Sequence, residues 1–192
     1  TGVEYVEFQV GRKQGHGLDL LYNKEQSVKN IKLYFENSIL IPWVLATSVV
    51  IGKENADIKG DLKKLRRWAE IAADLGVSYL RVFPAHSGEI DIDSVVKILR
   101  NISDKLINIP VSVLLETHGT IATGKAMRNI IEKVNRENIN VIWDIAHTVV
   151  HGETVEESYN YLHPYLKHVH IKDFAKIKDS INDNNPYSSW KR

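Results

Sequence analysis

The fold of this chain is decided by three short runs, Val111-Ser-Val-Leu-Leu-Glu116, Asn140-Val-Ile-Trp-Asp144 and Lys167-His-Val-His170. Each suits a strand buried on both faces, and each ends in a carboxylate or an imidazole. Between the runs, at 122–134 and 153–166, apolar residues recur at helical spacing. Strands separated by helices form a parallel sheet, so the carboxyl ends of all three strands are expected on one side.

Glu116, Asp144 and His170 are therefore expected to lie together at one edge of the sheet. Neighbouring strands are only about 4.8 Å apart, so side chains at successive strand ends come within reach of one ion. A lone Glu at a strand end is more often a surface group, but three suitable ligands at successive strand ends favour a divalent metal. Three protein ligands also leave positions open for a substrate.

The first half of the chain continues the same alternation. Strands are expected at residues 3–8, 39–47 and 77–83, and helices at 24–36, 61–75 and 92–106. Ser27 is a candidate cap for the first of these helices. Loops are indicated by the glycines at 11, 15 and 17 and by the polar stretch 52–60. Six strands that alternate with helices are typical of an α/β fold.

The α/β fold that these features favour is a (β/α)8 TIM barrel, with residues 1–192 in a single domain. No G-x-G-x-x-G turn follows a strand and no G-K-[ST] occurs, which argues against a nucleotide-binding sheet. A barrel places its catalytic groups at strand carboxyl ends, where Glu, Asp and His stand here. Because six strands are found, we expect an incomplete barrel without its first and eighth strands, with the polar segment 175–192 leading toward the eighth. An open six-stranded sheet, the alternative, would expose two long apolar edges.

The composition is that of an ordinary globular protein. The 192 residues are 43% hydrophobic and 26% charged, enough for one substantial core. A net charge of +1 argues against a surface built for nucleic acid. Cysteine is absent, so thiolate metal sites and disulfides are excluded. No apolar run reaches the roughly 20 residues of a membrane span and no signal-like start is present, so a cytoplasmic location is expected, with a processed secreted chain as the alternative.

Five motifs carry a resemblance to a known family. They are Val-Glu-Phe at 6–8, Leu-Arg-Val-Phe at 80–83, Glu-Thr-His-Gly at 116–119, Trp-Asp-Ile-Ala-His at 143–147 and His-Val-His-Ile-Lys-Asp at 168–173. Together they resemble the xylose isomerase-like TIM barrel family, which includes sugar and sugar-phosphate isomerases and epimerases and the AP endonucleases. The resemblance implies one divalent metal ion (Mn, Mg, Co or Zn) held by Glu, Asp, His and Glu on the fifth to eighth strands. Glu116, Asp144 and His170 match the first three ligands, and the fourth has no match in this chain.

The resemblance also implies a reaction and its residues. We expect an isomerase or epimerase of small-molecule sugars or sugar phosphates, or a polyol dehydratase, in which a proton moves through a metal-stabilised enediolate. Glu116 would then be both metal ligand and catalytic acid/base, paired with the unmatched eighth-strand Glu. His147, His118 and Lys172 are expected to bind substrate oxygens, although the two histidines suit local structural roles equally well. Lys176 is a further candidate for a phosphate or hydroxyl group.

Three more side chains are assigned structural roles. We expect His168 to pack on the opposite side of its strand from His170, and His86 to cap a loop rather than reach the strand ends. Arg81 lies inside a strand, where a structural salt bridge with a carboxylate is favoured.

Two other functions stay open. An AP endonuclease would need several metal ions and an Asp-x-His soon after the seventh strand, which the residues after His170 do not provide. A non-catalytic remnant of the barrel is the second alternative. The number of metal ions per chain distinguishes the isomerase from the endonuclease. No membrane partner is expected, and self-association into a homo-oligomer is left open.

Overall fold

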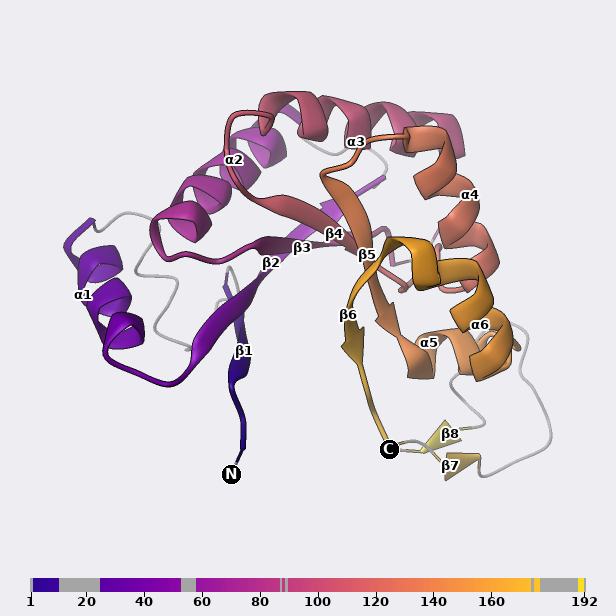
Figure 1. The fold of residues 1–192 in the computed structure, drawn as a ribbon. Helices are drawn as coiled ribbons and strands as arrows, with labels where there is room; N and C mark the ends of the chain where they lie inside the picture. The colour runs from indigo at the N-terminus through magenta and orange to yellow at the C-terminus, as the bar shows by residue number, and fades with distance from the viewer. Residues whose placement is uncertain are drawn as a thin grey trace.

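The computed structural model describes residues 2–10, 25–52, 58–86, 88, 90–173, 175–176 and 190–191. Its centre is a sheet of six parallel strands whose order in space is their order in the chain. The strands are β1 (Tyr5–Gln9), β2 (Ile41–Ile51), β3 (Tyr79–Pro84), β4 (Ser112–Glu116), β5 (Ile139–Asp144) and β6 (Leu166–His170). The sheet curls into an arc with helices along its outer side (Figure 1). The predicted incomplete (β/α)8 barrel is therefore confirmed.

Helices connect each strand to the next, so that all six strands run in the same direction. They are α1 (Glu25–Glu36), α2 (Ile58–Asp74), α3 (Ile92–Lys105), α4 (Gly124–Val134), α5 (Ile145–Val150) and α6 (Val155–Leu162), followed by a 3-10 turn at His163–Tyr165. Side chains of Asp91, Thr123 and Thr154 accept hydrogen bonds from the first turns of α3, α4 and α6. Such caps satisfy backbone N–H groups that have no partner inside the helix, and so they fix where each crossover begins.

The curled sheet has two chemically different faces because successive strand residues point to opposite sides. On the outer face, Leu80, Val113, Leu115 and Val141 join the large apolar core that packs under the helices. On the inner face lies a small apolar cluster of Val44, Leu114 and Ile142. Toward the carboxyl ends of the strands, the side chains on the inner face are charged and polar. These side chains form the site described below.

Several predicted element boundaries differ from the structure. Ser27 lies inside α1, which begins at Glu25, so its assignment as a cap was wrong. The helix α2 begins at Ile58, inside the stretch 52–60 that was expected to be a loop. The helix expected at 153–166 ends at Leu162, because Pro164 follows and the chain tightens into the 3-10 turn. The glycines at 11, 15 and 17 lie outside the described residues.

Beyond β6, two short strands form an antiparallel pair, β7 (Ala175–Lys176) with β8 (Trp190–Lys191). The rest of the segment 175–192 lies outside the described residues. Among the helices of the described ranges, none combines the length and the apolar character needed to cross a membrane. The cytoplasmic location and any self-association stay predictions.

Candidate metal centre

Glu116, Asp144 and His170 meet at the carboxyl ends of β4, β5 and β6. One potential ligand atom from each side chain lies within 4.8 Å of the other two. The Nδ1 atom of His170 is 3.5 Å from Glu116 Oε1 and 3.9 Å from Asp144 Oδ2. The two carboxylates are 3% and 0% exposed. The structure thus brings together the three side chains that the sequence indicated, and their role as ligands stays a prediction.

Thr117 locks the ends of β4 and β5 together. Its backbone N–H donates to Ile142 O at 3.0 Å, and its Oγ1 accepts from the backbone N–H of Asp144 at 2.8 Å. Asp144 in turn caps α5, with Oδ1 accepting from the backbone N–H of His147 at 3.4 Å. Because Oδ1 is committed to the helix, Oδ2 is the oxygen that faces the site.

Arg81 and Glu7 form a second layer behind the three side chains. Arg81 Nη1 is 3.3 Å from Glu7 Oε1 and 3.3 Å from Glu116 Oε2, which confirms the predicted salt bridge of Arg81. Glu7 Oε2 is 2.9 Å from His170 Nε2. The sequence interpretation included Glu7 in a motif but gave it no role in the site, because it lies in the middle of β1 rather than at the strand end. Alternation along β1 places Tyr5, Glu7 and Gln9 on one face, and this was the available signal.

His168 lies on the same side of β6 as His170, so the expectation of opposite sides was wrong. Its Nε2 atom is 3.0 Å from Glu7 Oε2. Side chains alternate along a strand, and residues two positions apart therefore share a face. The strand β6 thus presents two histidines to the inner side of the sheet.

His118, His147 and His86 form a row at the rim. The rings of His118 and His147 are 4.2 Å apart between centroids, and those of His86 and His118 are 5.0 Å apart. The Nδ1 atoms of His86 and His118 are 3.3 Å apart. His86 therefore reaches the strand ends, contrary to its assignment as a loop cap. The predicted residues His118 and His147 lie beside the metal-ligand candidates.

Gly119 allows the turn after β4 to dock on the end of β3. Its φ is +52°, and a Cβ atom there would lie 2.3 Å from the backbone oxygen of Ala85. Thr120 donates to the same oxygen from its backbone N–H and from its hydroxyl, both at 2.9 Å. Only glycine fits this position, and the close approach brings His118 next to His86.

Lys172 also lies at this rim, as the sequence indicated. Its ammonium group forms an ion pair with Asp144 Oδ2 and lies 3.4 Å from His147 Nε2. The side chain thus contacts a candidate metal ligand directly. The side chain of Lys176 lies outside the described residues.

Burial and neighbouring charges set the protonation of the site. Burial would lower the pKa of His170, but its hydrogen bonds with Glu116 and Glu7 outweigh this and raise it to about 9. Burial would raise the pKa of Glu7, but hydrogen bonds from His168 and His170 lower it to about 2. Burial lowers the pKa of both His118 and His147 to about 4. At neutral pH the metal-free site therefore holds a protonated His170, while the two rim imidazoles are neutral.

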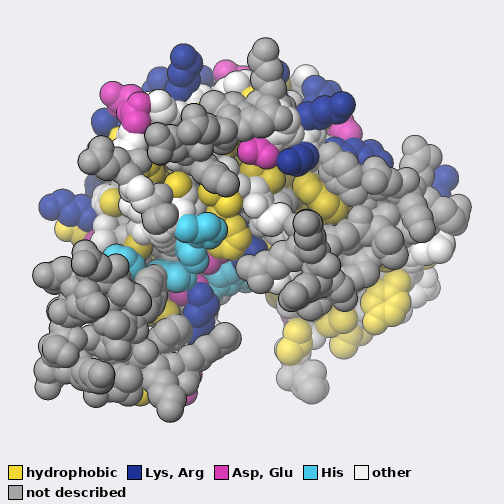
Figure 2. Space-filling model, turned by 180° about the vertical axis from the view of Figure 1, so that it is seen from behind, with side chains coloured by type: hydrophobic (Ala, Val, Ile, Leu, Met, Phe, Trp, Pro, Cys, Tyr) yellow, Lys and Arg dark blue, Asp and Glu magenta, His cyan; other side chains and the backbone are white. Residues whose placement is uncertain are grey.

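A pocket of about 550 Å³ opens onto these groups. It is lined by Glu7, Gln9, Arg81, Phe83, Glu116, His118, the segment His168–His170, Ile171 and Lys172. Figure 2 shows histidine side chains gathered in a hollow next to acidic and basic groups. The volume falls within the range usual for sites that bind small molecules.

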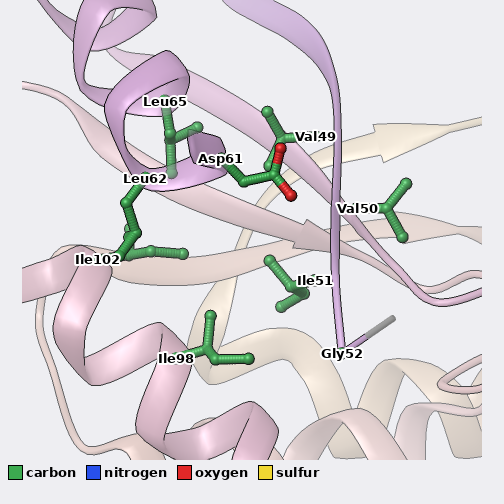
Figure 3. Close-up of a pocket in the computed structure, with 9 residues that line it drawn as sticks. All are labelled: Val49, Val50, Ile51, Gly52, Asp61, Leu62, Leu65, Ile98 and Ile102. Carbon is green, nitrogen blue, oxygen red and sulfur yellow. The ribbon is translucent and has the colours of Figure 1, made fainter. Parts of the chain in front are cut away.

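A second hollow, between β2, α2 and α3, is a poorer candidate. Its lining side chains are apolar except for Asp61, and they come from the end of β2 and from the facing helices (Figure 3). Its volume is only about 20 Å³, which is little more than one water molecule occupies. Of these two hollows, the inner-face pocket is the one large enough to hold a substrate.

The residues present fit a divalent cation. Glu116 Oε2 and Asp144 Oδ2 are buried and form ion pairs with Arg81 and Lys172, but within the described part of the chain neither accepts a well-formed hydrogen bond. Buried carboxylate oxygens normally have such partners. Two carboxylates and an imidazole are a donor set used for Zn²⁺ and similar ions, and the adjoining pocket leaves space for further ligands.

Sequence comparison connects the chain with a family. The family model described as xylose isomerase-like TIM barrel matches residues 1–187. No curated protein matches the chain in sequence.

Solved structures with the same fold are numerous. The structure of AsbF from Bacillus anthracis, a probable 3-DHS dehydratase involved in petrobactin synthesis, has a TM-score of 0.77 at 19% identity, covering 91% of this chain and 64% of that one. D-psicose 3-epimerase, solved in the presence of D-fructose, has a TM-score of 0.73 at 13% identity, covering 88% and 63%. The IOLI protein with a bound zinc atom has a TM-score of 0.68 at 21% identity, covering 81% and 58%. The chain thus spans less than two thirds of the length of these structures, and at such identities the likeness shows a shared fold.

Proposed function

The chain belongs to the xylose isomerase-like TIM barrel family, and on this basis we propose that it is a divalent-metal-dependent isomerase or epimerase of sugars or sugar phosphates. The observation that carries the proposal is the meeting of Glu116, Asp144 and His170 within 4.8 Å of one another at the edge of a pocket of about 550 Å³. The structural neighbours include a probable 3-DHS dehydratase and a D-psicose 3-epimerase solved in the presence of D-fructose, which supports a sugar-like substrate class.

The three side chains would hold the ion, and Glu116 would also move the proton. A bound divalent cation draws electron density from a substrate carbonyl or hydroxyl oxygen and so makes the neighbouring C–H bond more acidic. The Glu116 carboxylate takes that proton, while Arg81, 3.3 Å from Oε2, keeps the carboxylate oriented. Exchange between aldose and ketose needs one such group, because the same carboxylate can carry the proton to the adjacent carbon. Inversion at one carbon needs a second group on the opposite face.

The rim side chains would bind the substrate's other oxygens. His118 and His147 are neutral at pH 7 because their pKa values are about 4, so each ring offers one donor and one acceptor to hydroxyl groups. Lys172 carries the positive charge that suits a hydroxyl or phosphate oxygen. Its contact with Asp144 means that it must turn away from that carboxylate to reach a substrate.

The test is turnover of a panel of ketoses, aldoses and polyols with Mn²⁺, Mg²⁺ or Co²⁺ in deuterated water. A proton-transfer mechanism incorporates deuterium at the carbon beside the carbonyl, and dehydration is recognised by loss of water from the product. Glu116→Gln should lower turnover at least about 100-fold, the usual contribution of a general base. Glu137→Gln, an exposed residue before β5, is the matched control and should keep wild-type turnover.

Two outcomes would contradict the proposal. A folded protein that binds metal but turns over no member of the panel would favour the non-catalytic remnant. A cluster of two or three zinc ions per chain, with cleavage of DNA at abasic sites, would favour the AP endonuclease.

A further inference from the structure

Glu7 contacts the far side of the imidazole whose near side faces the metal-ligand candidates. Its Oε2 atom is 2.9 Å from Nε2 of His170. The other ring nitrogen, Nδ1, lies 3.5 Å from Glu116 Oε1. The ring of His170 is thus placed between one carboxylate on β1 and the carboxylates on β4 and β5, although β1 and β6 are the two ends of the sheet.

This contact decides which ring nitrogen can bind a cation. An ionised carboxylate only accepts hydrogen bonds, so Nε2 must carry the hydrogen that it shares with Glu7. A cation that binds His170 must displace the second ring proton, and the other nitrogen, Nδ1, then has the lone pair. That lone pair is directed to the space between Glu116 and Asp144, which is where the ion would lie.

Glu7 is itself held by two further donors. Arg81 Nη1 is 3.3 Å from Oε1, and His168 Nε2 is 3.0 Å from Oε2. Arg81 also lies 3.3 Å from Glu116 Oε2, so Arg81, Glu7, His170 and Glu116 form a closed ring of polar contacts. A carboxylate with this many partners has a single orientation, and through its hydrogen bond it also fixes the orientation of the His170 ring.

We propose that Glu7 is a positioning residue that fixes the tautomer and ring orientation of His170, so that Nδ1 is presented to a divalent cation. The inference rests on the metal site of the proposed function and deepens it. Carboxylates that hold a ligating histidine in this way commonly contribute 10- to 100-fold to metal affinity. His168 would support this role, because its Nε2 atom also contacts Glu7 Oε2 and so helps to hold the carboxylate in place.

Glu7, His168 and His170 also form a group of possible ligands, which raises the question of a second ion. Two features favour positioning over ligation. Arg81 already lies against Glu7 with a side chain only 5% exposed, and its fixed positive charge would repel a cation placed there. A second ion would also require both nitrogens of His170 to bind metal at once.

In the first experiment the metal-stripped full chain is titrated with Co²⁺, and binding is measured from the absorption of the bound ion. We expect one ion per chain in the wild type and in Glu7→Gln, with affinity lowered about 10- to 100-fold in the variant because a glutamine can donate as well as accept. Glu4→Gln is the matched control, since Glu4 is an exposed residue just before β1. It should bind Co²⁺ like the wild type.

The second experiment needs no variant and is independent of whether Glu7→Gln folds. Long-range ¹H–¹⁵N correlation spectra of the Zn²⁺-loaded wild type report which nitrogen of each histidine binds metal. We expect Nδ1 of His170 to be coordinated and Nε2 to keep a hydrogen that exchanges slowly with water.

The outcomes separate this inference from the proposed function. Unchanged Co²⁺ affinity in Glu7→Gln, or coordination of His170 through Nε2, would overturn the role of Glu7 while leaving the metal site intact. Two ions per wild-type chain and one in the variant would make Glu7 a ligand instead. A wild type that binds no ion would overturn both proposals.

Discussion

Leu115 and Glu116 are neighbours in the chain, yet they lie on opposite faces of the sheet and serve different purposes. Leu115 is fully buried in the apolar core beneath the helices. Glu116 is 2% exposed and faces a pocket, where its partners are Arg81 and His170. One step along β4 therefore separates a residue that stabilises the fold from one that is suited to chemistry.

Equal burial therefore has unequal consequences on the two faces of the sheet. On the outer face, removing apolar surface from water contributes directly to stability. On the inner face, the cost of desolvating each charge offsets much of its attraction to a partner, so buried ion pairs add little net stability. Substitutions on the outer face should therefore change mainly the free energy of unfolding, and substitutions on the inner face should change metal binding and the pH dependence of stability.

The largest expected effect is on metal affinity in Asp144→Asn. A structural zinc site with four ligands is worth about 10 to 16 kcal/mol, so one ligand accounts for about 3 to 4 kcal/mol, or on the order of 100- to 1,000-fold in affinity. Asparagine keeps the shape and the cap of α5, and the free energy of unfolding of the metal-free protein should change by less than about 1 kcal/mol. Calorimetric titration with Mn²⁺ and urea unfolding measure the two quantities. Wild-type affinity in the variant would show that Asp144 is not a ligand.

Leu115→Ala should give the opposite pattern at a slightly smaller size. Truncating a fully buried leucine leaves a cavity and costs about 3 kcal/mol in the free energy of unfolding. Metal affinity of the folded variant should stay within about twofold of the wild type, because the side chain points away from the pocket. Urea unfolding in the presence of a chelator and the same Mn²⁺ titration provide the comparison. A large loss of metal affinity would mean that the two faces are not independent.

The sequence predicted the fold well because its signals are local and repeated. Buried runs such as Val111 to Glu116, separated by helical spacing, fix a parallel sheet and place the strand ends together. The helix ends were less accurate, as at Ser27, because a capping residue is recognised only once the first turn is known.

The contacts across the inner face were not predictable in the same way. Glu7 and His170 are joined by the curl of the sheet, and nothing in the spacing of residues along one strand reports how strongly a sheet curls. His86 reaches His118 only because Gly119 permits a turn closer than any other residue would allow. By contrast, the position of His168 was available from strand alternation alone.

The pH dependence of stability should arise on the inner face, because the titrating histidines lie there. The pKa of His170 is raised to about 9 from 6.5, so its proton stabilises the metal-free fold below pH 6.5, and this stability is lost as the pH rises toward 9. After allowance for partial exposure to solvent, the loss should be about 2 kcal/mol. The lowered pKa values of His118 and His147 act in a separate window, where stability falls as the pH drops from 6.5 to 4. Urea unfolding of chelator-treated protein should show a maximum near pH 6.5, and His170→Gln should lose only the alkaline slope.

The smallest expected effect is a gain in metal affinity on Lys172→Met. The ammonium group of Lys172 lies against Asp144 in the metal-free protein, so a cation that uses Asp144 must compete with it. Removing one such charge near a partly exposed site should tighten Mn²⁺ binding by about tenfold, or about 1.4 kcal/mol. Lys167→Met removes an exposed charge from the preceding strand, β6, and should leave the affinity unchanged. If Lys172→Met instead weakens Mn²⁺ binding, the ammonium group does not compete with the ion. It would then orient the Asp144 carboxylate for the ion, as Arg81 orients Glu116.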